Sequence, residues 1–144
     1  MTQPNRTTLA VWTRLISIGT KIVSDIDNAM KDQGLPSLSW YDAILEIEKA
    51  GPDGIRPFEL KDRLLLPQYG TSRLLDRIEK AGFIERQACK ADGRGHSMSI
   101  TDAGRDVRRR MWGIYSKLLT QRIENRLSPK KASELANLLA MLKS

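Results

Sequence analysis

Residues 72–86 read SRLLDRIEKAGFIER, and the spacing of hydrophobic residues changes within this stretch. Leu74, Leu75 and Ile78 follow the three- and four-residue steps of one helix face. Gly82 is typical of a helix C-terminus, and after it apolar and polar residues alternate as they do in a half-exposed strand. The stretch therefore predicts a short helix that leads directly into a β-strand.

A β-hairpin is predicted directly after this helix. Its strands cover residues 83–90 and 96–100, where Ile84, Met98 and Ile100 are expected to face inward. The residues between the two strands, ADGRG, combine glycine with charge and are typical of an exposed turn. The chain thus changes from a helical period to a β period and then folds back on itself.

A long helix is predicted at the N-terminus. Apolar residues from Thr8 to Met30 recur at helical spacing and mark one face. Gly34 and Pro36 then end the helix, because glycine suits the left-handed C-terminal position and proline cannot continue a helix.

Two shorter helices are predicted next. Ser39, followed three residues later by Asp42, has the form of a capping box and predicts the start of the second helix. That helix ends at the turn-forming residues 51–54. Pro57 suits the first turn of a third helix, and the fourth helix is expected to begin after Pro67.

Two more helices follow the hairpin. Thr101 is a good N-cap for a helix that runs to about Arg126, and Ser128 followed by Pro129 begins a last helix in the same way. Two short helices joined by a tight turn and followed by a hairpin indicate a winged helix-turn-helix. The predicted fold is therefore mainly α, with six helices and a small β-hairpin wing.

The chain is expected to form one domain over residues 1–144. Residues 37–100 would form the winged helix-turn-helix core. The helices of residues 8–34 and 101–144 hold more apolar surface than this small core can cover. Burying the excess against a second copy of the chain predicts a homodimer.

The positive charge is concentrated in the middle and C-terminal parts of the chain. The net charge is +7, and residues 55–110 carry 13 Lys and Arg against 8 Asp and Glu. Residues 1–54 carry 5 against 7. A basic surface can bind a polyanion such as nucleic acid, or it can simply be exposed to solvent. Charge alone leaves both interpretations open.

The sequence shows no features typical of a membrane protein, a secreted protein or an enzyme. Charges interrupt every apolar stretch too early for a membrane span, and the N-terminus has no apolar leader segment. A single cysteine cannot form an intrachain disulfide, which suits a reducing compartment. We therefore expect a cytoplasmic protein that is not an enzyme, since no nucleophile has a recognisable base nearby.

No metal or other cofactor is expected. The chain has one cysteine and one histidine, whereas a structural zinc site needs four ligands. Cys89 and His96 can face each other across the hairpin, which leaves a zinc site completed by carboxylates as an alternative. A redox role for Cys89 is a second alternative, because Arg86 and Lys90 would lower the pKa of its thiol.

The sequence resembles the MarR family of bacterial and archaeal regulators in nearly its whole element order. Residues 72–86 are similar to the recognition helix of the family, its glycine stop and its first wing strand. Residues 92–94 (DGR) are similar to the wing-tip Asp-x-Arg, and residues 100–104 (ITDAG) to the Leu-Thr-x-x-Gly entry of the fifth helix. Two positions depart from the pattern: Arg56 stands where Ser or Thr is commoner, and residues 67–70 replace a Ser-rich turn.

The fourth helix is expected to carry the contacts to DNA. A helix in the major groove presents the residues near its N-terminus to base edges, while cations around it bind phosphates. Gln68 suits adenine, Arg73 suits guanine or phosphate, and Arg77 suits a phosphate or a carboxylate of its own chain. The predicted DNA-binding residues are Gln68, Tyr69, Ser72, Arg73, Arg77, Arg86, Lys90 and Arg94.

The resemblance also implies a role for the wing tip. Arg94 lies between two glycines, so its guanidinium would enter a narrow minor groove. Asp92 would support nearby arginines, and Lys90 and Arg86 would add positive charge to the hairpin. A solvated, charged turn is the alternative interpretation.

Three tryptophans are candidates for an effector pocket. Trp12, Trp40 and Trp112 are expected on the first, second and fifth helices, which in the family surround a cleft for small aromatic or phenolic effectors. The same residues suit a core or a dimer interface. The combined prediction is a homodimeric repressor that reads a pseudo-palindromic site in double-stranded DNA and is released by a small effector. A winged-helix protein-interaction module without DNA readout is the alternative.

Overall fold

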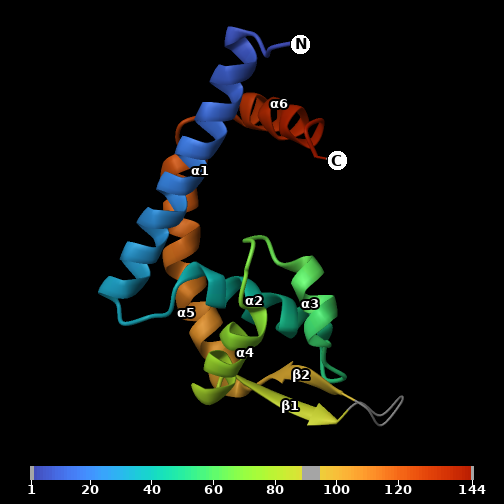
Figure 1. Cartoon of the computed structure of the whole chain (residues 1–144). Coiled ribbons are helices and arrows are strands. Elements are labelled where there is room, and N and C mark those ends of the chain that lie inside the picture. The colour runs from blue at the N-terminus through green and yellow to red at the C-terminus, as the bar shows by residue number, and fades with distance from the viewer. Residues whose placement is uncertain (1, 89–94, 144) are drawn as a thin grey trace.

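The computed structural model describes residues 2–88 and 95–143. Within these ranges the elements are α1 (Arg6–Asp32), α2 (Leu38–Ala50), α3 (Pro57–Arg63), α4 (Thr71–Lys80), β1 (Ile84–Ala88), β2 (His96–Ile100), α5 (Asp102–Leu119), the π-helical turn η1 (Thr120–Glu124) and α6 (Pro129–Ala140). Figure 1 shows α2, α3 and α4 gathered with the hairpin, while α1 and α5 extend away from them toward α6. The predicted mainly α fold with a β-hairpin wing is confirmed. None of the described helices has an apolar stretch long enough to cross a bilayer.

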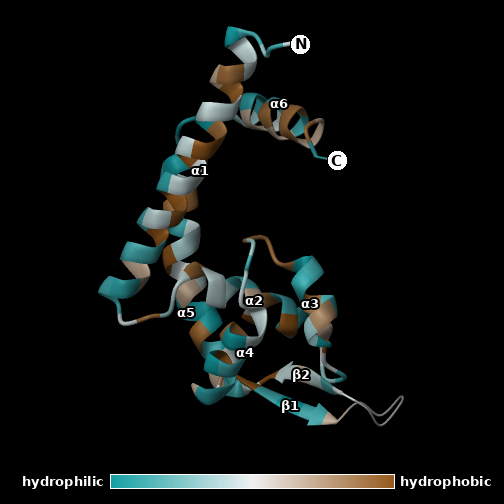
Figure 2. Ribbon diagram, viewed as in Figure 1, coloured by the Kyte–Doolittle hydropathy of each residue, from teal (hydrophilic) through white to brown (hydrophobic). Residues whose placement is uncertain are grey.

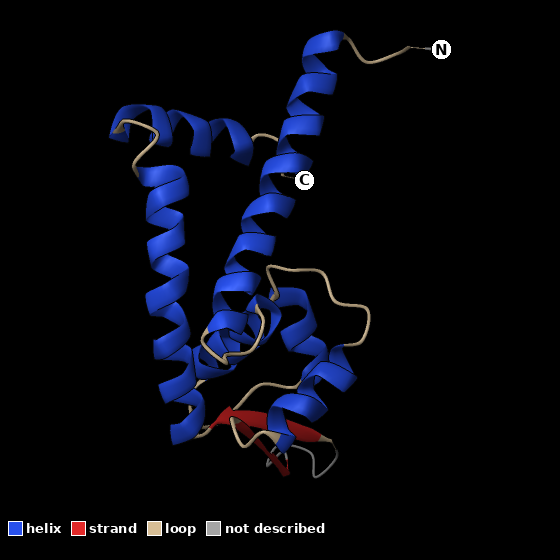
Figure 3. Ribbon diagram, turned by 90° about the vertical axis from the view of Figure 1, so that its left-hand side faces the viewer, coloured by secondary structure: helices blue, strands red, loops and turns tan. Residues whose placement is uncertain are grey.

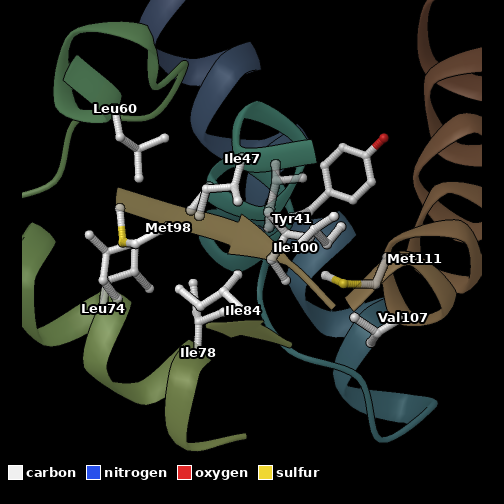
Figure 4. Packing of buried hydrophobic residues seen from close by; sticks show 14 of the residues in the cluster. Tyr41, Ile47, Leu60, Leu74, Ile78, Ile84, Met98, Ile100, Val107 and Met111 are labelled. Atoms are coloured by element: carbon white, nitrogen blue, oxygen red, sulfur yellow. The ribbon is translucent and has the colours of Figure 1, made fainter. Parts of the chain in front are cut away.

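The hydrophobic core lies where α2 meets the hairpin and α5. Ala43, Ile44 and Ile47 of α2 are fully buried there. Side chains from α3, α4, both strands and α5 converge around them, as the close view in Figure 4 shows. Each fully buried aliphatic side chain contributes about 1.5–3 kcal/mol, so this cluster holds the helices and the wing in fixed relative positions.

The wing is attached to the core through its second strand. β1 and β2 pair antiparallel, with Ile84 opposite Ile100. Both residues and Met98 are buried, as predicted. On its other edge β2 exchanges two backbone hydrogen bonds with Ile55: the Ile55 N–H donates to Met98 O (3.0 Å) and the Met98 N–H donates to Ile55 O (2.8 Å). The base of the wing is therefore held by the segment that precedes α3.

α2 begins at Leu38, so the prediction that Ser39 and Asp42 form a capping box is wrong. Ser37 occupies the N-cap position without a side-chain hydrogen bond to the helix. The Leu38 N–H instead donates to the Asp27 carboxylate of α1 at 2.7 Å. A contact between helices thus satisfies one of the N-terminal amides that have no partner within the helix. The carboxylate of Asp42 turns to the loop that follows α3.

α4 begins at Thr71, which is later than the predicted start after Pro67. Gly70 is its N-cap residue, with φ −131° and ψ 56°, and the Gly70 carbonyl accepts the first helical hydrogen bond from the Leu74 N–H at 2.9 Å. A glycine inside a helix is less stable than an alanine by up to about 1 kcal/mol, so Gly70 favours a position just before the helix. Residues 67–70 therefore form a loop ahead of the helix.

An ion pair joins α1 to the π-helical turn that follows α5. Asp25 of α1 lies 2.6 Å from the Arg122 guanidinium in η1. The hydrogen bond from Lys21, and after it the charge of Arg122, lower the pKa of Asp25. η1 interrupts the helix that was predicted to run from Thr101 to about Arg126, because its turn is π-helical.

Exposed hydrophobic side chains cover the N-terminal half of α1, the end of η1 and α6. Figure 2 shows these brown segments at the end of the molecule away from the core, and Figure 3 shows α6 turning from the end of α5 toward α1. We call this region the apical surface. Its large exposed residues are Leu9, Val11, Trp12, Leu15, Ile16, Ile18, Ile123, Leu135, Leu138, Leu139, Met141 and Leu142. An apolar surface of this size marks a site of interaction.

Candidate nucleic-acid interface

The solvent side of α4 is the centre of the candidate interface. Leu74, Leu75 and Ile78 turn into the core and are buried. The side chains that remain exposed are Ser72, Arg73, Asp76, Arg77 and Lys80. Among the described residues, neither Arg73 nor Arg77 pairs with a carboxylate. Two guanidinium groups are therefore available on one face of a short, rigidly packed helix.

Gln68 and Tyr69 lie in the loop ahead of α4, not on the helix where they were predicted. Gln68 is half-buried, whereas Tyr69 is completely exposed. They come directly before the N-cap Gly70, so they lie at the same end of α4 as Ser72. A fully exposed tyrosine presents both a ring face and a hydroxyl, which suits a contact with a partner molecule.

Arg86 of β1 contacts α4. Its Nη2 atom lies 2.5 Å from Asp76 Oδ1, and its Nε atom lies 3.7 Å from Glu79 Oε1. Both carboxylates would repel a polyanion that approached α4, and the single positive charge of the Arg86 guanidinium offsets part of this negative charge, mainly at Asp76. The structure therefore places Arg86 as a brace between the wing and α4, while its predicted contact with DNA remains a prediction.

The predicted wing-tip residues Lys90, Asp92 and Arg94 lie outside the described residues, as does Cys89. Gly95, where the description resumes, has a φ of +73°, a backbone conformation that favours glycine. His96 follows it and is exposed at the start of β2. Within the described ranges, no three His, Cys, Asp or Glu side chains are arranged to hold a metal ion.

Arginines in the first half of α5 are engaged within the chain. Arg105 pairs with Asp102 at 2.8 Å on the helix surface. Arg108 reaches α2, where its Nε atom lies 2.9 Å from Glu48 Oε2. The hydrogen bond to Glu48 raises the pKa of Arg108. Arg108 therefore joins α5 to α2, whereas the pair of Arg105 with Asp102 stays within the surface of α5.

The three tryptophans predicted to form an effector pocket are not gathered within one chain. Trp12 is 60% exposed on the apical surface. Trp40 packs edge-on against Phe83, with their ring centroids 6.2 Å apart. Trp112 alone among the three lines a described cavity. The three tryptophans therefore have different surroundings, which residue spacing along three separate helices did not reveal.

The cavity has a volume of about 300 Å³ and lies between α2, α5 and the loop joining α3 to α4. Its lining residues are Leu38, Tyr41, Asp42, Leu45, Leu65, Leu66, Trp112, Tyr115 and Leu119. The sequence analysis missed Tyr41, Asp42 and Tyr115 as site residues. A usable signal was present at Asp42, because a carboxylate inside the apolar stretch YDAIL must find a partner when the helix is buried.

The sequence is similar to those of known transcriptional regulators. Residues 33–95 match the model of the MarR family. The HTH-type transcriptional regulator PecS of Dickeya dadantii (strain 3937) is 26% identical over 106 residues, which are 71% of this chain and 60% of that protein. An uncharacterized HTH-type transcriptional regulator of Bacillus cereus is 30% identical over 94 residues, 65% of this chain and 60% of that protein. The chain thus matches about 60% of the length of these curated relatives.

Solved structures share the fold over nearly the whole chain. A MarR family transcriptional regulator from Streptomyces coelicolor, in complex with DNA, has a TM-score of 0.85 and 24% identity, covering 99% of this chain and 89% of that one. A mutant MarR from E. coli, complexed with operator DNA, has a TM-score of 0.80 and 21% identity, covering 99% of this chain and 100% of that one. These structures and this chain therefore share the winged-helix fold.

Proposed function

Because residues 33–95 match the model of the MarR family, we propose that the chain is a member of that family, binds double-stranded DNA sequence-specifically and regulates transcription. The observation that carries the proposal is the exposed face of α4, where Arg73 and Arg77 have no carboxylate partner among the described residues. A helix of this kind fits the major groove, where arginine binds guanine or phosphate.

The proposed contacts divide by position. Ser72 and Arg73, near the N-terminus of α4, would reach base edges, and Arg77 one turn later would bind a phosphate. Gln68 and Tyr69 would contact DNA from the loop ahead of the helix. At the wing, Arg94 and Lys90 would bind the minor groove and its phosphates, with Asp92 supporting the arginine.

We propose that the protein acts as a homodimer through its apical surface. Two copies joined there would bury the hydrophobic side chains of the apical surface, which belong to residues 8–34 and 101–144, and would leave the core of residues 37–100 free for DNA. Two α4 helices related by a twofold axis would enter successive major grooves, roughly 34 Å apart, on a pseudo-palindromic site.

The proposed biological role is that of a cytoplasmic repressor. Occupation of a promoter would block transcription, and a small effector would lower DNA affinity by favouring a dimer with a different spacing of the α4 helices. The proposal includes no catalytic step and no cofactor.

The test measures binding of the full chain to duplex fragments of its source genome at several salt concentrations. Arg73→Gln should weaken binding and, if Arg73 binds a phosphate, lower the slope of log affinity against log salt by about one unit. If it binds guanine, preference at one base pair should be lost, at a cost of about 1–3 kcal/mol.

The matched control is Lys130→Gln, which removes the same charge from exposed α6, far from α4. This variant should leave the affinity for duplex DNA nearly unchanged. Equal retention of every duplex at physiological salt would contradict the proposal and favour the protein-interaction module.

A further inference from the structure

The cavity between α2, α5 and the loop joining α3 to α4 has three aromatic walls. Tyr41 of α2 meets Tyr115 of α5 with ring centroids 5.2 Å apart at 87°, and Trp112 meets Tyr115 at 5.5 Å and 76°. Trp112 also stacks on Tyr41 at 6.2 Å. Because Trp112 is 45% exposed, the cavity opens to solvent beside this ring. Aromatic faces carry partial negative charge and attract cations.

A carboxylate lies in the same cavity without a cation. The Asp42 residue is only 7% exposed, and its Oδ2 atom accepts one hydrogen bond, from the Leu66 N–H at 2.8 Å. Among the described residues Asp42 forms no ion pair, and the Arg108 guanidinium is held by Glu48 at 2.9 Å. A buried carboxylate is costly unless a positive charge compensates it.

We propose that this cavity binds a small organic cation, such as an aryl- or alkyl-substituted ammonium, with Asp42 as its counter-ion and Tyr41, Trp112 and Tyr115 as its cation–π walls. The proposal rests on the regulatory function above and specifies the class of its effector. A phenolate or carboxylate of similar size is disfavoured, because the charge of Asp42 repels it.

The electrostatics of the wall agree with this assignment. Burial, and after it the neighbouring Tyr41 and Asp42, raise the pKa of Tyr115. Tyr115 therefore stays neutral at physiological pH, so its ring adds an electron-rich face without a hydroxyl charge. Apart from Asp42, the lining consists of leucines and these rings, which suits the apolar substituents of an ammonium ion.

Asp42 also connects the cavity to the DNA-binding helix. It holds the amide of Leu66, and Leu65 and Leu66 line the cavity themselves. The same loop continues through Gln68 and Tyr69 into α4. A cation that binds the Asp42 carboxylate competes with the Leu66 amide and shifts the start of α4, so binding of the cation lowers affinity for DNA.

The test titrates the full chain with three probes of similar size by isothermal calorimetry. Benzyltrimethylammonium supplies the cation, benzyl alcohol the neutral control and benzoate the anion. We expect the cation to bind at least about tenfold more tightly than either control, in the range of a desolvated cation–π contact. Asp42→Asn, which keeps an acceptor for the Leu66 amide, should abolish this preference. Glu134→Gln on exposed α6 removes the same charge elsewhere and should preserve it.

A second variant covers the case in which Asp42→Asn does not fold. Trp112→Leu, at a half-exposed position, should lower the affinity for the cation about fivefold or more without changing the affinity for benzyl alcohol as much. Tighter binding of benzoate, equal binding of all three probes, or absence of heat with the cation would overturn the assignment. A last outcome combines no binding of the cation with a weaker dimer in Asp42→Asn. It would show that a basic side chain of a second copy is the counter-ion of Asp42, and it would likewise overturn the proposed cation site.

These readouts are independent of the proposed regulatory function. Calorimetry with the probes reports on the cavity whether or not the chain binds DNA. Conversely, loss of sequence-selective DNA binding in the absence of any probe contradicts the regulatory function alone.

Discussion

Gly104, near the start of α5, lies against the backbone of the wing. A Cβ atom there would lie 2.1 Å from the Phe83 carbonyl oxygen and 2.8 Å from a side-chain atom of Ile100. The Phe83 carbonyl also accepts the Thr101 N–H at 3.1 Å, so its position is fixed by a second contact. At this residue α5 and the wing touch without room for a methyl group.

We expect Gly104→Ala to destabilise the fold by about 1–3 kcal/mol, because the clash is with backbone atoms that cannot rotate away. Urea unfolding followed by circular dichroism measures the change. Gly113→Ala is the matched control, since a Cβ at Gly113 meets nothing within 4 Å. It should stabilise α5 by about 0.5–1 kcal/mol, as glycine is less favourable than alanine in a helix. Equal changes in both variants would contradict the role of the Phe83 carbonyl.

At the scale of elements, the contact between β1 and α4 determines what the recognition surface presents. Arg86 supplies the positive charge for two α4 carboxylates, Asp76 and Glu79. These groups are partly exposed, so the pairs contribute at most about 1 kcal/mol to stability. Their larger effect is electrostatic, because unpaired carboxylates on α4 would face the phosphates of DNA.

We expect Arg86→Gln to weaken DNA binding, and Asp76→Asn in the same chain to restore most of the lost affinity, because it removes the exposed charge. A double-mutant cycle in a fluorescence anisotropy assay measures this coupling. Were Arg86 instead to bind a phosphate directly, the second substitution would restore nothing and the salt dependence would flatten in both variants.

At the scale of the whole molecule, the apical surface lies opposite the wing and α4. Figure 1 shows the N-terminal half of α1 and α6 at one end and the hairpin at the other. Within the described residues, α6 has no buried residue at all, although half of its positions are apolar. Its hydrophobic side therefore contributes nothing to the core of one chain and is available to a second copy.

We expect Leu138→Glu, at a residue 61% exposed in the single chain, to convert a dimer into a folded monomer. The affinity for a two-half-site duplex should fall by at least about 100-fold, because the second half-site is no longer linked to the first. Sedimentation velocity and anisotropy measure the two effects. Ser133→Glu on the same helix adds an equal charge at a polar position and should do neither. A monomeric unsubstituted protein would contradict the proposed assembly.

The sequence by itself determined the type and order of the helices and strands, because periodicity, glycine stops and proline at helix starts act between residues a few positions apart. The inward-facing residues of α4 and the hairpin followed from the same local rules. The motif at residues 100–104 also indicated Gly104, but the reason for a glycine there is the Phe83 carbonyl, which lies in another element.

Only the tertiary structure decided which distant groups meet. Asp42 binds the amide of Leu66, 24 residues away, and Asp27 of α1 takes over the capping of α2. Arg86 meets Asp76 for the same reason. Such contacts depend on how the core orients whole helices, and a hydrogen bond or ion pair leaves no periodic trace in the sequence. The aromatic cavity and the pairing of Arg86 with the α4 carboxylates are therefore properties of packing.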